Sequence, residues 1–432
     1  MVIERLKFGL ARSAEALLLT GIILAHWFPD PARLNVIILF LPILCLRFAL
    51  TRRLLTRTPL DVLLLAFLIL CILNSYTAPY TWGFYVVSRA AMGVGIVWVV
   101  GDWGRPPRAD RGFVIGWLAF GILIGVVSLF TAQYTIKSIE LQPILDLLPR
   151  LRDLPLVQGG FNVNEISGAM TLLVVPAAAF ALTQQIDLPR RWRLLAWAAL
   201  VTLSLALLLA QSRFAIFGVL AACGMVIFGV LLPGRRRRFA LAILLILTAV
   251  EVILAGNWII PENASESALL RDENSQISRL NIWGSALAIL RDHPLTGVGI
   301  NQFRARPVRD QYPVPGYEQQ VLPHAHNILL QTGSDLGLPG MLVYVGWNAA
   351  LALMLWRTWK RGGGWARTGA VGAAAGLLAH FAFDSGDAIT LFDRFIFSYW
   401  LLVGFAAALY IGVREEGNVA GAQVAPDRHP LL

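Results

Sequence analysis

Long runs of apolar residues, separated by short polar segments, follow one another along most of the 432-residue chain. Each run has roughly the 17 to 25 residues that a helix needs to cross the hydrocarbon core of a bilayer. Apolar residues occupy every face of these runs, as expected for helices that satisfy their own backbone hydrogen bonds in lipid. The pattern predicts an all-α polytopic membrane protein with about twelve transmembrane helices. The predicted spans are 9–28, 34–50, 60–77, 82–100, 112–132, 163–183, 192–210, 213–232, 238–256, 326–357, 366–383 and 391–412, the tenth being long enough to bend.

Composition agrees with a membrane protein, since 57% of the residues are hydrophobic and only 14% are charged. The net charge of +10 would suit a nucleic-acid partner, but the basic residues cluster in alternate connections between the spans, as at 235–238. This distribution follows the positive-inside rule. It predicts a multi-pass protein with both termini in the cytoplasm, surrounded by membrane lipids and without a nucleic-acid partner.

The chain is predicted to form one transmembrane domain, 1–432, with two long outward connections at 133–162 and 257–325. Function is expected there, because binding and catalytic residues concentrate on loops held by a rigid scaffold. Apolar residues at helical spacing near 141–151 indicate either a helix lying along the membrane interface or a simple connector. Both interpretations remain open.

The second connection, which we call the outer loop, contains apolar residues at helical intervals that predict an amphipathic helix over 278–292. Prolines and glycines then predict irregular chain over 300–323. The outer loop is too short for a large core of its own. We therefore expect it to pack on the membrane domain as a periplasmic helical lid that carries part of the active site.

His324, His326 and Asn327 form the densest group of unusual residues, at the outer end of the tenth span. A histidine titrates near neutral pH, so His326 is a candidate general base for an acceptor hydroxyl. An interfacial histidine bonded to a backbone carbonyl is an equally good interpretation. Metal binding ranks lowest, because no Cys, His or carboxylate partner set is evident beside the pair.

Arg213, Arg279 and Arg89 are the second feature. Arg89 lies inside a predicted span, where an arginine costs roughly 2.5–3.5 kcal/mol and should face a polar cavity or a partner. Arg279 falls in the first turn of the predicted lid helix, where a bound anion would relieve its repulsion from the helix dipole. A structural ion pair for Arg89 and an exposed position for Arg279 are the alternatives.

The carboxylates and amides carry weaker signals. No two acidic residues are separated by a single residue, so the chain lacks a DxD-type pair that would hold a metal-bound nucleotide sugar. Asp384 and Asp387, near the outer end of the eleventh span, are expected to form ion pairs. Asn162 and Asn164 are expected to cap a helix, with contact to a glycan as the alternative.

His326-Asn327, nine further residues and then Gly337-Leu338-Pro339-Gly340 resemble the signature of the bacterial O-antigen ligase family and its wider polymerase superfamily. Upstream, Gln211-Ser212-Arg213 and Ser278-Arg279 resemble the paired arginines of that family, and the segment 293–299 resembles its loop motif. The resemblance covers roughly 211–340. Arg89 matches no motif of the family, and its role is inferred from the residue alone.

The resemblance implies a GT-C-like, metal-independent, inverting glycosyltransferase without a cofactor, in the bacterial inner membrane with its active site facing the periplasm. Its donor would be a glycan linked to undecaprenyl diphosphate, and its acceptor a sugar hydroxyl of lipid A-core. His326 would be the base, and Arg213, Arg279 and Arg89 would hold the diphosphate. His324, Asn327, Asn162 and Asn164 would support the site.

Three other functions remain open at this stage. An O-antigen polymerase and a protein O-oligosaccharyltransferase share the signature and the donor. A membrane transporter, which belongs to a different class, would need a charged or broken-helix site near the bilayer midplane.

Overall fold

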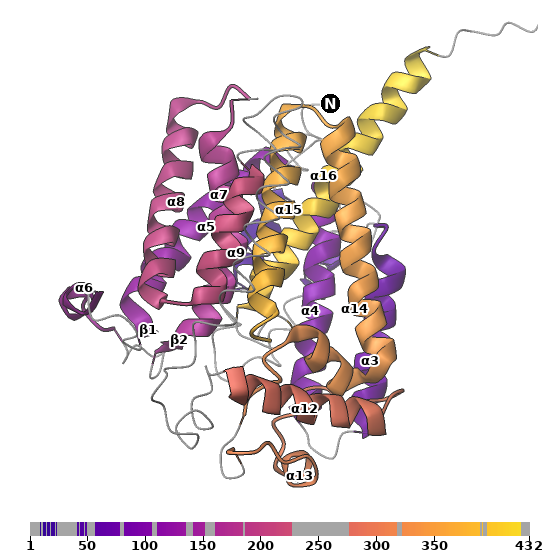
Figure 1. The fold of residues 1–432 in the computed structure, drawn as a ribbon. Helices are drawn as coiled ribbons and strands as arrows, with labels where there is room; N and C mark the ends of the chain where they lie inside the picture. Colours follow the sequence, from indigo (N-terminus) through magenta and orange to yellow (C-terminus); the bar gives the residue numbers. More distant parts are fainter. Residues whose placement is uncertain are drawn as a thin grey trace, which may run out of the picture.

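The computed structural model of the chain describes residues 57–77, 82–105, 110–134, 141–151, 160–184, 186–226, 276–317, 322–388, 391 and 395–424, with single positions between 9 and 23 and between 41 and 49. These residues form a bundle of long helices, and Figure 1 shows them side by side with shorter helices across one end. The main helices are α3 (Asp61–Thr77), α4 (Trp82–Asp102), α5 (Asp110–Thr131), α7 (Val163–Leu182), α8 (Arg190–Ala210), α9 (Arg213–Val226), α14 (Ile328–Arg361), α15 (Gly364–Asp384) and α16 (Ile396–Val424).

Five of the described helices are long and apolar enough to cross a membrane, judged by length and composition. They are α5, α7, α8, α14 and α16. This supports a multi-pass all-α membrane protein, as the sequence predicts. The number of twelve spans stays a prediction, because the predicted ninth span, 238–256, and much of the first two lie outside the described residues.

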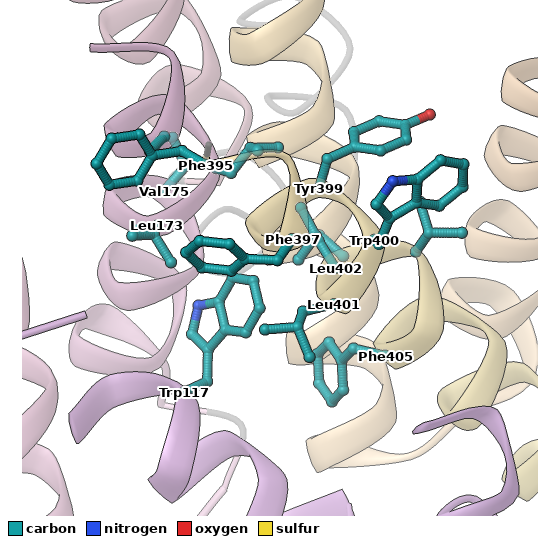
Figure 2. Packing of buried hydrophobic residues seen from close by; sticks show 14 of the residues in the cluster. Trp117, Leu173, Val175, Phe395, Phe397, Tyr399, Trp400, Leu401, Leu402 and Phe405 are labelled. Carbon is teal, nitrogen blue, oxygen red and sulfur yellow. The ribbon is translucent and has the colours of Figure 1, made fainter. Parts of the chain in front are cut away.

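The centre of the bundle is α7, which packs against α8, α9 and α15. Its many small side chains let neighbouring helices approach closely, a feature of helix packing in membranes. On α15, a Cβ atom added to Gly372 would meet the backbone of Pro176 at 3.1 Å. Large side chains of α16 fill the core (Figure 2): Phe397 lies beside Phe120 of α5, and Trp400 beside Trp347 of α14.

The bend expected in the predicted tenth span is confirmed in α14. Gly337 has φ of 69° inside this helix, a left-handed conformation that only glycine adopts without cost, and Pro339 follows it. Proline lacks a backbone N–H and cannot continue the helical hydrogen bonds. The first turns of α14 therefore point in a different direction from the rest of the helix.

The described part of the outer loop contains α12 (Gln276–Asp292) and α13 (Arg306–Gln311). The predicted helix over 278–292 is confirmed, whereas the prediction of irregular chain over 300–323 is wrong at α13. Figure 1 shows α12 lying crosswise at the end of the bundle, where it packs against α14. The loop also has a small apolar cluster of its own, formed by Ile282, Ala286, Ile289, Phe303, Val308, Tyr312, Val314, Tyr317, Leu322 and Ala325.

The segment that follows α12 is joined to the first turns of α14 by backbone hydrogen bonds. Val298 N donates to Ser334 O, Gly299 N to Asp335 O, and Leu338 N to the carbonyl of Pro294, at 2.9, 3.1 and 2.7 Å. Gly337 thereby frees an N–H of the helix for a loop carbonyl. This part of the outer loop is packed onto the helix bundle and is not an independent unit.

The side chain of Asp335 stabilises the same junction through hydrogen bonds. Its carboxylate is fully buried and accepts hydrogen bonds from the backbone N–H of Asn301 at 2.9 Å and from Nε2 of Gln331 at 2.8 Å. Buried polar groups need such partners because an unsatisfied one costs about 1–3 kcal/mol. Gln331 also accepts from the backbone N–H of Ala325 through Oε1, at 2.7 Å. Together these contacts fix the segment that carries the histidines.

The shorter outward connection begins and ends in a parallel two-strand ladder, β1 (Ala132–Gln133) with β2 (Phe161–Asn162). Between them, α6 (Gln142–Leu147) exposes Ile144 and Leu147. A short helix with exposed apolar residues is compatible with the interfacial interpretation of 141–151.

Candidate functional site

The candidate site begins with the short segment before α14. His326 is buried and has φ of 49°, a left-handed conformation that is uncommon for a residue with a side chain. The backbone carbonyl of His326 accepts from Nε1 of Trp283 on α12, at 3.4 Å. Strained backbone of this kind persists only where the surroundings hold it, and it often occurs at active sites.

The side chains of His324, His326 and Asp387 meet in one buried cluster. Nε2 of His324 lies 3.1 Å from Oδ1 of Asp387, and Nδ1 of His326 lies 3.7 Å from the same oxygen. Asp387 follows the end of α15, so the cluster joins the start of one helix to the end of the next. Asp387, which we expected in an ion pair, thus has two histidine rings as its neighbours.

His324 is held as a neutral ring. Its pKa is lowered to about 3, chiefly by burial; Asp387 acts in the opposite direction, and the nearby His326, Arg304 and Arg279 add to the lowering. Nδ1 of His324 accepts a hydrogen bond from the backbone N–H of His326 at 3.3 Å. A neutral imidazole carries one hydrogen, which must then sit on Nε2 and face Asp387. His324 thus orients the carboxylate without a positive charge of its own.

Arg279 reaches this cluster through an aromatic contact. Its guanidinium lies 4.6 Å from the centre of the Phe214 ring at the start of α9. A Cβ atom added to Gly386 would meet the same ring at 2.8 Å, so the ring packs against the backbone just before Asp387. The structure therefore brings the predicted Arg279 and the predicted histidines to one place.

The other arginines are placed less directly. Arg213 is exposed and immediately precedes Phe214, while Arg89 is half-buried in α4. Their binding of a ligand remains a prediction. Arg304, which our sequence interpretation did not identify, is close enough to lower the pKa of His324. It lies in a polar stretch without periodicity, and only its positive charge near the histidines in sequence could have indicated it.

The predicted asparagines form hydrogen bonds with backbone groups. Asn327 caps α14, its side chain accepting from the N–H groups of Leu329 and Leu330 at 3.0 and 3.1 Å, and its Nδ2 donates to the carbonyl of Ser385 at 3.2 Å. It thus joins the histidine segment to the chain before Asp387. Asn162 caps α7 and accepts from the N–H of Asn164 at 2.8 Å, which confirms the expected capping.

One premise of the sequence interpretation is wrong. We expected no partner set for a metal beside the histidine pair, but Asp387 provides one. The candidate ligand atoms of His324, His326 and Asp387 all lie within 4.8 Å of one another. The error arises because Asp387 is distant in sequence and approaches only when α14 and α15 pack together.

The fold and this cluster define a multi-pass membrane protein with a histidine, aspartate and arginine site at one end of its helix bundle. Residues 198–345 match the family model Wzy_C, described as O-antigen ligase. The match supports the O-antigen ligase family or its wider superfamily, whose members are glycosyltransferase-like ligases and polymerases. It includes Arg213, Arg279 and both histidines, whereas Asp387 lies beyond it. No curated protein matches the chain.

Proposed function

We propose that this protein is an O-antigen ligase of the bacterial inner membrane. It transfers a glycan from undecaprenyl diphosphate to a sugar hydroxyl of lipid A-core at the periplasmic face, with inversion at the anomeric carbon. The observation that carries the proposal is the buried contact of His326 with Asp387, beside the guanidinium of Arg279, within and adjoining the matched region.

His326 acts as the general base. Nδ1 faces Asp387 at 3.7 Å, and we assign to Nε2 the role of taking the proton of the acceptor hydroxyl. Such contacts are often long in a substrate-free site and shorten when the reacting groups are in place. The carboxylate selects the tautomer of the ring and stabilises the imidazolium that forms, as in hydrolases with an aspartate behind the histidine. The acceptor oxygen forms its bond to the anomeric carbon as the bond to phosphate breaks.

The leaving diphosphate needs cations and no separate acid, because its charge is spread over several oxygens. Arg279 offers a forked pair of donors to these oxygens, with its plane held by Phe214. We assign Arg213, which precedes Phe214, and Arg304 to the same cationic surface. We also assign Arg89 to the diphosphate-binding arginines, because an arginine inside a predicted span is costly and should face a polar partner.

The proton positions favour chemistry without a metal ion. A cation bound by the cluster would need the lone pair on Nε2 of His324, but the hydrogen bond from the N–H of His326 to Nδ1 puts a hydrogen on Nε2. The positive charges of Arg304 and Arg279, which act on the same ring, add repulsion. We therefore propose a metal-independent reaction, although the three ligand atoms are close together.

A transfer assay with purified protein tests the proposal. The protein is incubated with lipid-linked glycan and either lipid A-core or excess donor, in the presence of a chelator. His326→Ala is compared with His293→Ala, a histidine of the same loop whose ring contacts Tyr312. We expect transfer to lipid A-core by the wild type and by His293→Ala, and none by His326→Ala.

Other outcomes would change the conclusion in defined ways. Lengthening of the donor without transfer to lipid A-core identifies a polymerase of the same superfamily. Activity lost on chelation overturns the metal-free reaction, and unchanged activity of His326→Ala removes this residue as the base. Movement of intact donor across the membrane without glycosyl transfer favours the transporter.

A further inference from the structure

A second cluster of buried polar groups lies at the end of α15, about one helical turn before Asp387. It joins His380 and Asp384 of α15 to Thr171 and the backbone carbonyl of Gly168 on α7. His380 is 4% exposed, and Asp384 is fully buried. Nε2 of His380 lies 3.5 Å from Oδ2 of Asp384. The general-base reaction proposed above uses neither side chain, so the pair needs a separate explanation.

The contacts of Nδ1 decide where the ring of His380 carries its hydrogen. Nδ1 lies 2.9 Å from Oγ1 of Thr171 and 3.0 Å from the carbonyl oxygen of Gly168. The hydroxyl of Thr171 donates its own hydrogen to the same carbonyl, at 2.6 Å. Both neighbours can therefore only accept from the ring, since a carbonyl has no hydrogen and that of the hydroxyl is already used. The hydrogen of the neutral ring sits on Nδ1, and Nε2 presents a lone pair to Asp384.

The facing atoms of His380 and Asp384 would repel each other if the carboxyl were ionised beside this neutral ring. An ionised carboxylate only accepts hydrogen bonds, and so does an imidazole nitrogen without a hydrogen. A hydrogen on Oδ2 of Asp384 turns the repulsion into attraction. An imidazolium facing an ionised carboxylate would have the same geometry, but it would place two charges in a buried position, where desolvation costs several kcal/mol per ion.

The surroundings of Asp384 favour its neutral form. The residue lies just beyond the predicted span 366–383, and burial, followed by the neighbouring carboxylate of Asp387, raises the pKa of Asp384 well above its usual range. Tyr344 of α14 and Tyr399 of α16 are also near Asp384, and a phenol carries no charge at neutral pH. The hydroxyl of Tyr399 donates its hydrogen to Oδ1 of Asn348 at 3.0 Å. That hydrogen is therefore directed away from Asp384.

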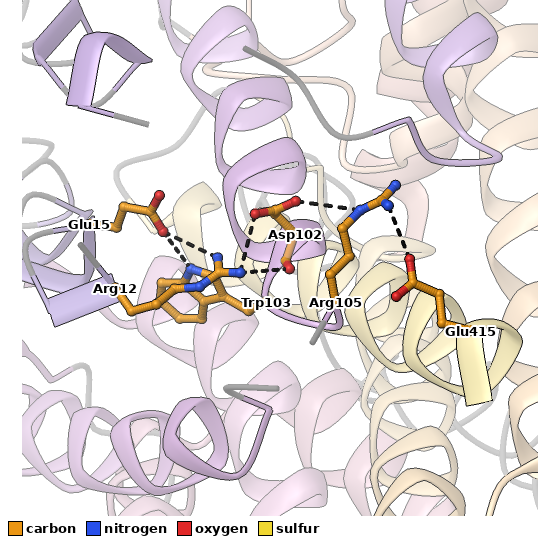
Figure 3. A network of polar contacts seen from close by, with 6 residues as sticks. All are labelled: Arg12, Glu15, Asp102, Trp103, Arg105 and Glu415. Carbon is orange, nitrogen blue, oxygen red and sulfur yellow. Dashed lines mark hydrogen bonds and ion pairs between the residues drawn. The ribbon is translucent and has the colours of Figure 1, made fainter. Parts of the chain in front are cut away.

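A polar network at the end of α4 shows how this protein holds carboxylates that are ionised. Figure 3 shows Arg12 between Glu15 and Asp102, at 3.3 and 3.2 Å. Arg105 lies between Asp102 and Glu415, at 3.5 and 3.0 Å. Each carboxylate there faces a guanidinium, which stays protonated in proteins. In the pair on α15, the carboxyl instead faces a histidine nitrogen that carries no hydrogen.

We propose that Asp384 is a neutral acid that donates its hydrogen to Nε2 of His380, and that the two are positioning residues for Asp387. The positioning role rests on the proposed function. The ring of His380 ties the last turn of α15 to α7, and the backbone N–H of Asp387 donates to the carbonyl of Phe383 in this turn, at 3.1 Å. A neutral Asp384 also leaves Asp387 as the ionised member of the two carboxyls. The negative charge then lies beside His326, where the imidazolium forms.

Infrared difference spectroscopy of the full-length protein in lipid nanodiscs, at pH 7 and without substrate, tests the protonation state. A protonated carboxyl has a C=O stretching band that an ionised carboxylate lacks and that shifts in D₂O. We expect this band in the spectrum of the wild type minus that of Asp384→Asn. His380→Leu should shift the band, because the acid loses its acceptor. Asp310→Asn, at an exposed aspartate paired with Arg306, is the control and should remove no such band.

Initial rates of glycosyl transfer test the positioning role. Asp384→Leu has a similar volume but no hydrogen to donate, and it should lower kcat by on the order of 10-fold at an unchanged KM for the donor, because small displacements of reacting groups are costly. Asp384→Asn should restore most of this loss, since the N–H of an amide can replace the carboxyl hydrogen toward Nε2. The same substitution at Asp387, which we expect to be ionised, should not be tolerated.

Three results would overturn the proposal. One is a difference spectrum without a carboxylic acid band. The others are an Asp384→Asn variant as slow as Asp384→Leu, or one that does not fold in a thermal unfolding experiment, because the negative charge of Asp384 would then be required. The infrared measurement needs no substrate, so it gives an answer even if the protein transfers no glycan.

Discussion

Oδ1 of Asp387 lies 3.1 Å from Nε2 of His324, and this contact joins the segment before α14 to the chain after α15. The same oxygen is the nearest described carboxylate partner of His326. Asp387 thus belongs to the candidate site although it lies outside the matched family region. Its contribution to the reaction can be measured without changing the shape of the side chain.

Asp387→Asn should reduce glycosyl transfer by on the order of 100-fold, the lower range of general-base effects. The amide keeps the volume of the carboxylate but cannot stabilise the imidazolium of His326. Initial rates at saturating donor provide the measurement. Asp310→Asn is the control, because Asp310 is exposed and pairs only with exposed Arg306 at 2.7 Å among the contacts described. Equal rates for Asp387→Asn and wild type would assign Asp387 a purely structural role.

Arg279→Lys should raise the KM for the lipid-linked donor although the positive charge is kept. Lysine lacks the planar fork that binds two phosphate oxygens and that stacks on Phe214. Loss of the stacking alone is worth about 0.5–1 kcal/mol, or roughly two- to five-fold in affinity. The matched control is Arg306→Lys at an exposed position of α13. A lysine variant with the donor KM of the wild type would show that only charge is needed.

Gly297→Ala and Gly337→Ala should each lower the thermal unfolding midpoint. Both glycines have positive φ, 62° and 69°, and an added Cβ would lie 2.4 Å from the backbone of Asp335 and 2.6 Å from that of Leu295, respectively. The backbone conformation alone costs about 1–3 kcal/mol for other residues. Gly284→Ala in α12 meets no neighbour within 4 Å and should stabilise the protein by about 0.5–1 kcal/mol. If all three variants unfold at the same temperature, the loop does not pack on α14 in this way.

Acid should destabilise the fold through His324. Burial lowers the pKa of this histidine from 6.5 to about 3, so below pH 6.5 the unfolded chain binds a proton that the folded chain does not. The part of the unfolding free energy that depends on a neutral His324 is fully present well above pH 6.5, and it is lost as the pH falls toward 3. Between pH 7.5 and pH 5 the loss is about 2 kcal/mol. Between pH 7.5 and 5, the unfolding free energy of His324→Gln should depend less on pH than that of the wild type. An identical pH dependence of the two proteins would exclude His324 as the cause.

Much of the fold follows from local sequence. Hydrophobic runs predict the long helices, the length of the predicted tenth span predicts the bend of α14, and helical spacing predicts α12. These signals are local, because each depends on residues within a few turns of one another. The short helix α13 was missed because six residues with a proline in the first turn show no readable periodicity.

Only part of the candidate site could be predicted from local sequence. Arg279 and the two histidines could be identified from the sequence, since motif spacing marks them. Asp387 and Arg304 could not be assigned, because their roles depend on how α14, α15 and the outer loop pack together.

The junction between Pro294 and Leu338 has a consequence for substrate entry. Hydrogen bonds between main-chain atoms tie the turn after α12 to α14 whatever side chains occupy those positions. Lifting this turn would break several of them at once, including those to the buried carbonyl groups of Ser334 and Asp335. We therefore expect a lipid-linked glycan to enter without displacing this turn.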